Sequence, residues 1–367
     1  LMASIKKYET AKGHAWRVQY RSPDGKSRTK RGFRTKSEAQ AWSDKNAVSI
    51  HDQDWIDPNA GRARIKEVGE RWLAMQTHLK PKTLHETEGL WRRYVLPEWG
   101  GRPVASVKPS EVQAWVATMG KSGSTVRQAH AVLAKVLDLA VMDKSIQVNP
   151  ARGVKLPRKG KAVKVYLTAE QLGRLAAACT RRSEIVWVLG TVGLRWGELA
   201  GLQVQDVNVL RGRLNIERSA VTVGSDIAIG APKTHERRSV AVPAAVMELL
   251  VPLIEGRGPT EYIWHRNDGT PLRVPSHGDW FDLAVQRCMS DDPAFPRVTP
   301  HGLRHVAAGL MVSAGANVKA VQRQLGHASA AMTLDTYTEL FDEDLESVSR
   351  AVNERVSGVV KLSSESA

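Results

Sequence analysis

Residues 299–340 read TPHGLRHVAAGLMVSAGANVKAVQRQLGHASAAMTLDTYTEL, and the spacing of their apolar side chains predicts three short helices. Thr299 can cap the first of these helices. The residues expected to form its buried face are Leu303, Val306, Ala307, Leu310 and Met311. Burial of that face predicts that His301, Arg304 and His305 lie together on an adjacent face, where they could meet a phosphate.

A polar residue is expected just beyond the second helix. Gly315 and Gly326 are typical helix-terminating residues, so His327 falls immediately after a helix end. Ser329 can cap a third helix, which carries Tyr337. Each of these side chains has an ordinary structural explanation when taken alone, so the functional information lies in the ordered set.

This set resembles the tyrosine recombinases, the integrase family to which phage lambda integrase belongs. The second box of that family is His-x-x-Arg, and HGLRH supplies it here with His301 and Arg304. The family pattern continues with Leu-Gly-His, which ends here in His327, and it closes on a nucleophile that corresponds to Tyr337.

The remaining positions of the family pattern lie upstream. The first box is an arginine in a Gly-Leu-Arg-x-x-Glu context, and TVGLRWGELAGL at residues 191–202 supplies Arg195 and Glu198. Between the boxes the family places a lysine in a β-hairpin turn. The stretch APKTHERRSVAVP offers Lys233 ahead of an alternating strand at residues 239–242, so every expected position is filled.

The resemblance implies a catalytic set of six residues. They are Arg195, Lys233, His301, Arg304, His327 and Tyr337. Tyr337 would attack a phosphodiester to give a 3′-phosphotyrosine and a free 5′-hydroxyl, and rejoining would need no ATP because the ester retains the bond energy. Arg195 and Arg304 suit the two non-bridging oxygens, since a planar guanidinium donates bidentately and stays charged.

The other residues would transfer protons, donate hydrogen bonds or orient the arginines. His301 would act as general base toward the tyrosine hydroxyl, and Lys233 would protonate the 5′ oxygen. His327 would donate a hydrogen bond to a phosphate oxygen. Glu198 would orient the Arg195 region, and His305, for which the chemistry has no role, is expected to be structural. No cofactor and no metal is expected.

The positive charge is concentrated in the first half of the chain. The net charge of +15 divides into +5 in residues 1–60, +12 in residues 61–165 and −2 in residues 166–367. A basic balance confined to particular segments favours a polyanion as partner, and many phosphate contacts would make binding steeply salt-dependent.

The cysteine content and hydropathy narrow the class of protein. Cys179 and Cys288 are isolated, without CxxC spacing, so neither a disulfide framework nor a thiolate metal site is indicated. No run of 18 apolar residues occurs, and the first residues lack the apolar core of a signal peptide. These features fit a reducing cytoplasm, and the resemblance implies that the protein acts on DNA in a bacterial host cell.

Residues 1–60 are expected to form an arm-type DNA-binding domain. Polar and apolar residues alternate around Trp16, Val18 and Tyr20, and the chain turns at residues 23–25, which predicts a short antiparallel sheet followed by a helix from Thr35 or Ser37. Residues 6–36 contain eleven Lys or Arg against two acidic residues. This resembles the arm-binding domains of phage integrases, in which a three-stranded sheet enters the major groove; a purely structural sheet is the alternative. The expected contacts are Lys6, Lys7, Arg17, Arg21, Arg28, Lys30, Arg31 and Arg34.

Residues 61–150 are expected to form a helical core-binding domain. One apolar face is traced by Ile65, Val68, Trp72, Met75 and Leu79, and another by Val126, Ala129, Leu133, Val136, Leu137 and Ala140, with Pro81, Pro97 and Pro109 between helices. By its position the bundle resembles the family's core-binding domain, which closes over DNA opposite the catalytic domain. Its expected phosphate contacts are Lys80, Lys82, Arg92, Arg93, Lys121 and Arg127.

Residues 151–164, ARGVKLPRKGKAVK, contain six basic residues and no acidic one, and they are expected to form an extended linker. Its expected DNA contacts are Arg158, Lys159 and Lys161. Residues 165–367 would then be the catalytic domain with a C-terminal tail. The predicted fold is α+β and multidomain: a small N-terminal three-stranded sheet with a helix, a helical bundle, and a mainly helical catalytic domain with a small sheet or hairpin.

The resemblance implies a phage-type integrase that acts as a homotetramer on the core and arm sites of attachment DNA, with a host DNA-bending protein and a phage directionality factor. A transposon or conjugative-element integrase and a type IB topoisomerase share this chemistry. A metal-dependent nuclease using His301 and His305 lacks a matching carboxylate cluster. A non-catalytic DNA-binding regulator would leave the six-residue set as coincidence.

Overall fold

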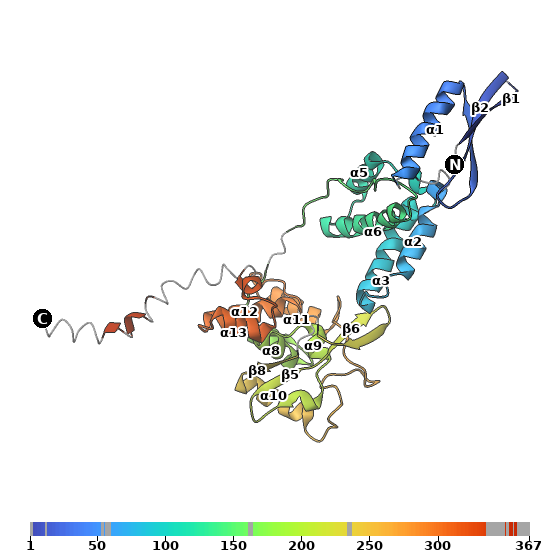
Figure 1. The fold of residues 1–367 in the computed structure, drawn as a ribbon. Helices are drawn as coiled ribbons and strands as arrows, with labels where there is room; N and C mark the ends of the chain where they lie inside the picture. The colour runs from blue at the N-terminus through green and yellow to red at the C-terminus, as the bar shows by residue number, and fades with distance from the viewer. Residues whose placement is uncertain are drawn as a thin grey trace. The chain divides into compact units, whose positions relative to one another are not determined.

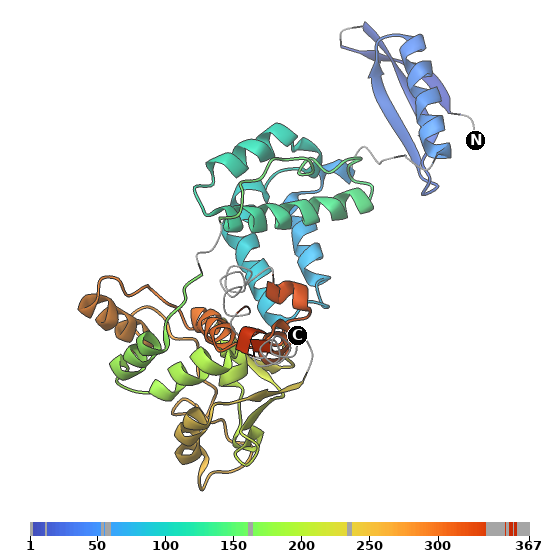
Figure 2. The same cartoon turned by 90° about the vertical axis from the view of Figure 1, so that its left-hand side faces the viewer.

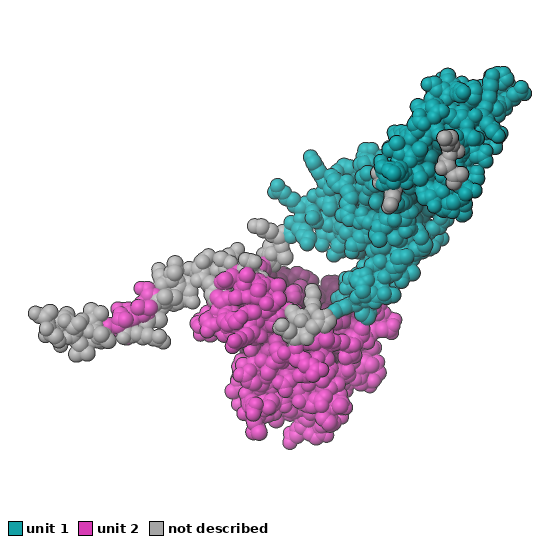
Figure 3. All heavy atoms as spheres, in the orientation of Figure 1, with its two compact units in different colours: residues 1–161 teal, residues 162–367 magenta. Residues whose placement is uncertain are grey.

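A computed structural model describes residues 3–11, 13–52, 55, 60–160, 164–232, 237–334, 349, 352–354 and 356–357. The chain divides into two compact units, residues 1–161 and residues 162–367, coloured separately in Figure 3. Among the residues that the structure describes, no helix is long and apolar enough to cross a membrane.

The chain begins with an antiparallel sheet of order β1-β2-β3 that is covered on one face by a helix (Figure 1). These elements are β1 (Ser4–Thr10), β2 (Gly13–Arg21), β3 (Ser27–Phe33) and α1 (Lys36–His51). Thr35, one of the two residues predicted to begin this helix, caps α1. Its hydroxyl accepts the Glu38 N–H at 3.1 Å. Tyr20 and Phe33 contact the ring of Trp42, so aromatic packing joins sheet and helix.

The next segment is the predicted helical bundle. Its helices are α2 (Ile65–Ala74), α3 (Pro81–Leu90), α4 (Leu96–Trp99), α5 (Pro109–Thr118) and α6 (Gly123–Met142). Shorter turns are η1 (Ala60–Arg62), the π-helical η2 (Trp91–Val95) and η3 (Val104–Ser106). All six apolar residues predicted for the face of α6 are buried, and four of them, Leu133, Val136, Leu137 and Ala140, belong to a core shared with α2, η2 and α4. The helices of this bundle are drawn in cyan and green in Figure 2.

Two local predictions for this bundle were wrong. Met75 was predicted to belong to the first apolar face. It is 56% exposed instead, because α2 ends at Ala74. Pro97 does not separate helices, because α3, η2 and α4 follow one another without a break. Pro97 lacks a backbone N–H and would normally interrupt a helix. The wider π-helical turn η2 just before it allows the chain to continue.

The beginning of the predicted linker is fastened to α5 and α6. Gln113 and Lys155 exchange hydrogen bonds of 2.9 and 3.1 Å, and the Arg127 guanidinium donates to the carbonyl of Pro157 at 3.2 Å. Residues 154–160 contain neither helix nor strand. The division of the chain into four parts at the predicted bounds stays a prediction.

The second unit is mainly helical. Its helices are α7 (Ala169–Ala178), α8 (Ser183–Val192), α9 (Trp196–Ala200), η4 (Val204–Asp206), α10 (Ala244–Ile254), α11 (Trp280–Asp291), α12 (Gly302–Ser313) and α13 (Val318–Leu325). Its strands are β4 (Val207–Asn208), β5 (Arg213–Ile216), β6 (Ser219–Val223), β7 (Asp226–Gly230) and β8 (Arg238–Ala241). They form an antiparallel sheet of order β4-β5-β8 and a separate β6-β7 hairpin.

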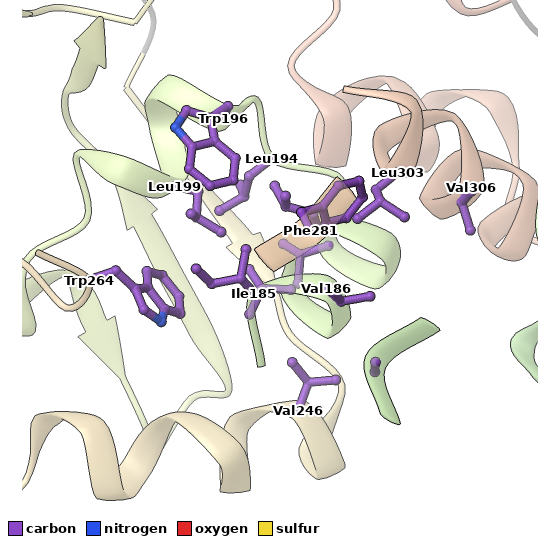
Figure 4. Packing of buried hydrophobic residues seen from close by; sticks show 14 of the residues in the cluster. Ile185, Val186, Leu194, Trp196, Leu199, Val246, Trp264, Phe281, Leu303 and Val306 are labelled. Atoms are coloured by element: carbon purple, nitrogen blue, oxygen red, sulfur yellow. The ribbon is translucent and has the colours of Figure 1, made fainter. Parts of the chain in front are cut away.

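Helix α8 lies at the centre of this unit and packs against α7, α10 and α12. Its residues Ile185, Val186 and Leu189 are fully buried, within a core that also takes in Phe281 of α11 (Figure 4). The predicted α+β fold, with its N-terminal three-stranded sheet, helical bundle and mainly helical second unit, is confirmed. The central position of α8 matters for function because the first predicted box follows its C-terminal end.

Candidate active site

Arg195 lies at the start of α9, just after the turn that ends α8. The turn requires Gly193, whose φ is +78° and whose missing Cβ would lie 2.5 Å from a methyl group of Leu325. The backbone N–H of Arg195 donates to Glu198 Oε2 at 3.0 Å, and its Nη1 donates to Glu198 Oε1 at 2.9 Å. The first box is therefore a closed unit in which a carboxylate one helical turn away holds the arginine.

Glu198 also holds a second arginine, Arg238 of β8. The two Arg238 terminal nitrogens donate to the two Glu198 oxygens at 3.0 and 2.8 Å. The Glu198 side chain is 1% exposed and that of Arg238 is 11% exposed. Burial alone would raise the pKa of Glu198, but the hydrogen bonds and charge of Arg238, with those of Arg195, lower it to about 2.

Arg304 is buried, which differs from the prediction that it shares an accessible face with His301. Its side chain points into the interior of the unit, where Nη1 donates to the carbonyl of Gly193 at 2.7 Å and Nη2 donates to that of Leu325 at 2.6 Å. Arg195 Nη2 donates to the next carbonyl, that of Gly326, at 3.3 Å. Two consecutive carbonyls at the end of α13 thus bring together the arginines of the two boxes.

His327 directly follows these carbonyls. Gly326 ends α13 with a φ of +66°, and a Cβ there would lie 2.8 Å from the Arg238 guanidinium. The His327 Nδ1 lies 2.9 Å from the hydroxyl of Thr333, and its backbone N–H donates to the carbonyl of Gln322 at 3.1 Å. Burial, followed by the charges of Arg304 and Arg195, lowers the pKa of His327 to about 4, so its imidazole is neutral at neutral pH.

The two histidines of HGLRH are neighbours. His301 precedes the first turn of α12 and is exposed, and its ring centroid lies 5.7 Å from that of half-buried His305 in an edge-to-face arrangement. Burial, followed by the charges of His301, Lys164 and Arg304, lowers the pKa of His305. His305 is therefore held neutral beside the candidate general base.

Two of the six candidates lie outside the described residues. Lys233 falls between β7, which ends at Gly230, and β8, which begins at Arg238. Tyr337 follows a helical segment that is described as far as residue 334. Ser329 caps that segment as predicted, because its hydroxyl accepts the Met332 N–H at 3.1 Å.

Arg238 is a candidate positioning residue that the sequence interpretation missed. Its only sequence signal was its place in the strand after Lys233, where a basic residue is unremarkable. Because Glu198 is buried, Arg238→Gln should leave that carboxylate with one cation instead of two and should raise its pKa. We expect DNA cleavage at neutral pH to slow by about tenfold. The stability that ionised Glu198 contributes is lost as pH falls from its unfolded pKa toward its folded pKa of about 2, so a raised folded pKa should make the fall of Tm between about pH 5 and pH 3 smaller than in wild type.

The neighbouring Arg237 provides a matched control for this variant. Its side chain is 77% exposed and pairs with Glu217 at 3.0 Å, so Arg237→Gln should leave both the cleavage rate and the acid dependence of Tm unchanged. Single-turnover cleavage of a duplex substrate at neutral pH measures the rate, and thermal unfolding between about pH 3 and pH 7 measures the acid dependence of Tm. A Tm that falls as steeply in acid in Arg238→Gln as in wild type would mean that the residue does not act through Glu198.

The strand register distributes the predicted N-terminal contacts over both faces of the sheet. Paired residues of antiparallel strands point to one face, and successive residues alternate. The face away from α1 carries Lys6, Arg17, Arg21 and Arg31, and the face toward α1 carries Lys7, Arg28 and Lys30. Arg28 lies 5.3 Å above the ring of Trp55, and Arg34 is exposed after β3. Four of the eight predicted contacts therefore share the uncovered face.

The predicted contacts of the bundle and linker are mostly exposed. Those with exposed side chains are Lys80, Lys82, Arg92, Arg93, Lys121, Arg158 and Lys159. Arg127 is half-buried, and its guanidinium donates a hydrogen bond to the linker at Pro157. One of its N–H groups is therefore already engaged by the protein. Lys161 lies outside the described residues.

Comparison with known proteins gives consistent matches along the chain. A model of the phage integrase family matches residues 165–344, a model of the phage integrase central domain matches residues 65–156, and a model of an arm DNA-binding domain matches residues 4–46. The integrase of Mycobacterium phage L5 is 28% identical over 319 residues, which cover 82% of this chain and 84% of that protein.

Solved structures show the same fold. The Tn1549 transposon integrase, in complex with a circular intermediate DNA, superposes with a TM-score of 0.65 at 23% identity, covering 74% of this chain and 94% of that chain. A lambda integrase dimer bound to a COC′ core site superposes with a TM-score of 0.58 at 17% identity, covering 92% of this chain and 95% of that chain.

Proposed function

The chain belongs to the phage integrase family and is a site-specific tyrosine recombinase, and we propose that it cuts and rejoins phage attachment DNA with Arg195, Lys233, His301, Arg304, His327 and Tyr337 as its catalytic residues. The observation that carries this assignment is the convergence at the end of α13. Arg304 and Arg195 bind the consecutive carbonyls of Leu325 and Gly326, and His327 is the next residue.

This arrangement suits a phosphodiester in its transition state. Two guanidinium groups fixed by main-chain carbonyls need no reorganisation when negative charge develops on the non-bridging oxygens. The neutral His327 accepts at Nδ1 when the Thr333 hydroxyl donates to it, which leaves the ring proton on Nε2 for a phosphate oxygen. Tyr337 would supply the nucleophile, His301 its general base and Lys233 the proton for the 5′ oxygen.

Double-stranded DNA is the proposed partner, with core sites contacted by the bundle and catalytic unit and arm sites contacted by the N-terminal sheet. We propose that four copies act together on two DNA sites in the cytoplasm of a bacterial host. A host DNA-bending protein and a phage directionality factor would determine whether the enzyme integrates or excises phage DNA. The basic residues on the uncovered face of the sheet support the arm-site assignment.

Trapping a covalent complex on attachment DNA tests the proposed function. Incubation with a nicked core site should give a protein–DNA adduct joined through a 3′-phosphate, in the presence of chelator as well as in its absence. Paired attachment sites should recombine, whereas a plasmid without them should keep its supercoils. Relaxation of a random plasmid would instead indicate a type IB topoisomerase, and adducts on transposon ends alone would indicate a transposon integrase.

A fragment that begins near Gly61 should separate the two DNA-binding roles. The N-terminal sheet packs on its own aromatic cluster, and all proposed catalytic residues follow Gly61, so the fragment should keep weak binding and cleavage at core sites. It should lose affinity for arm sites, and full integration should fail or fall sharply, because one protomer could no longer bridge arm and core DNA.

Gel shifts of the fragment and the full chain on arm-only and core-only duplexes measure this division. The salt concentration must be matched, because phosphate contacts dominate both affinities. Equal binding of arm DNA by the two proteins would contradict a separate arm-binding role for residues 4–56.

A further inference from the structure

A second cationic site lies in the catalytic unit, away from the candidate active site. It is a cavity of about 380 Å³ between the turn that precedes α8, the irregular segment before α11 and the start of α11. Four arginines line it: Arg181, Arg182, Arg266 and Arg273. None of the proposed catalytic residues that the structure describes is among its lining residues.

The carboxylates of this cavity do not neutralise the arginines. Asp268 pairs with Arg266 at 3.3 Å and also accepts from Thr270, and Asp279 accepts the N–H of Ser276 at 2.7 Å. Within the part of the chain that the structure describes, Arg181, Arg182 and Arg273 have no carboxylate within 4.0 Å. The lining therefore carries a net positive charge, although residues 166–367 together sum to −2.

Arg182 is held in this cluster at a conformational cost. Its φ is +61°, in the left-handed region that non-glycine residues seldom adopt, and such strain typically costs about 1 kcal/mol or more. Burial, followed by the charge of Arg181, lowers the pKa of its half-buried guanidinium. The nearby Glu184 carboxylate raises this pKa in part, and an anion between the two arginines would further offset the burial and the repulsion that lower it.

The geometry of α8 sets the separation between this cavity and the active site. Arg182 precedes the first residue of α8, whereas Gly193, whose carbonyl binds Arg304, follows its last. A ten-residue helix is about 15 Å long, so one phosphate cannot occupy both places. Because successive base pairs rise about 3.4 Å, this length corresponds to roughly four base pairs of duplex.

We infer that the cavity lined by Arg181, Arg182, Arg266 and Arg273 binds a backbone phosphate of the same DNA duplex, about four base pairs or more from the cleaved bond. The inference rests on the proposed function, since it takes duplex DNA as the substrate. Guanidinium groups are suited to phosphate oxygens, and such a contact adds affinity and register without reading sequence. The cavity would therefore fix where along the duplex the scissile phosphate meets Arg195 and Arg304.

The test is a scan of core-site duplexes that each carry one neutral methylphosphonate in place of a phosphate. For the wild-type chain, one position about four or more base pairs from the cleaved bond should cost on the order of tenfold in affinity. The same replacement should cost the double variant Arg181→Gln, Arg273→Gln less than twofold, because its partner is already lost. The variant should also show a shallower dependence of affinity on salt, by about one unit of slope per lost contact.

Exposed Arg211, in the turn before β5, does not line the cavity, so Arg211→Gln should behave as wild type throughout the scan. The inference is overturned if the double variant keeps the wild-type affinity and salt slope, or if every methylphosphonate costs variant and wild type equally. A wild-type chain that binds the duplex but forms no covalent adduct would instead count against the proposed function, while the scan would still decide the cavity.

Discussion

Replacing Tyr337 with Phe should abolish the covalent protein–DNA adduct and leave DNA affinity within about twofold of wild type. The change removes one hydroxyl, and without that oxygen no phosphotyrosine can form. Because the same residue is needed for cleavage and for rejoining, recombination of paired sites should vanish completely. The measurement is a denaturing gel of the trapped adduct, with a gel shift on the same duplex to report binding.

Tyr262 offers a matched control in the same unit. It is one of six tyrosines in the chain, and it lies in the segment between α10 and α11, where its backbone carbonyl accepts from Arg257 at 2.7 Å. Tyr262→Phe also removes one phenolic hydroxyl, but the adduct should persist at wild-type yield. If instead Tyr337→Phe still forms an adduct, peptide mapping of that adduct would locate the true nucleophile.

Arg304→Lys should slow cleavage by well over tenfold, on the order of the hundredfold or more seen when one oxyanion donor is lost. The Arg304 guanidinium already donates to the carbonyls of Gly193 and Leu325, and its planar fork can still direct an N–H toward a phosphate. A lysine ammonium keeps the charge but cannot reproduce this geometry. Single-turnover cleavage of a saturating duplex substrate reports the loss directly.

Thermal unfolding of the same variant separates catalysis from stability. Arg304 is 3% exposed, so Lys in its place should leave buried carbonyls poorly satisfied, at a cost of about 1–3 kcal/mol. Arg195→Lys provides the comparison, because the Arg195 side chain is 23% exposed and one of the three hydrogen bonds that Arg195 donates comes from its backbone N–H. It should lose a similar factor in rate with a smaller change in Tm. Near-normal cleavage in both variants would refute the proposed roles of the two arginines.

Local sequence patterns predicted much of the fold because they depend on nearest neighbours. Thr35 and Ser329 were predicted to begin helices, and in both cases the side chain accepts the expected backbone N–H. The predicted face of α6 is buried throughout. Such features can be read from the spacing of residues along the chain. The family resemblance can be read in the same way, because it rests on the order of short motifs.

The burial of Arg304 could not be predicted in this way. Helical periodicity places residue 304 next to residue 303 on the helix surface, but it does not reveal that α8 and α13 end against that surface and offer carbonyls there. The role of Arg238 was missed for a similar reason, since its partner Glu198 is distant in sequence. Main-chain acceptors and long-range ion pairs leave no periodic trace in a sequence.

The contacts that both proposed catalytic arginines make with carbonyl oxygens also bear on how this site can evolve. A substitution replaces a side chain, but it leaves the carbonyl of residue 193, 325 or 326 in place, so no point mutation deletes an anchor outright. Leu325 can therefore drift among apolar residues of similar shape without cost to its acceptor. Gly193 and Gly326 are more constrained, because both have a positive φ that is strained for other residues, and a Cβ would lie 2.5 Å from a Leu325 methyl group at Gly193 and 2.8 Å from the Arg238 guanidinium at Gly326. Among the three residues that supply these carbonyls, tolerance to mutation should thus be higher at Leu325 than at the two glycines.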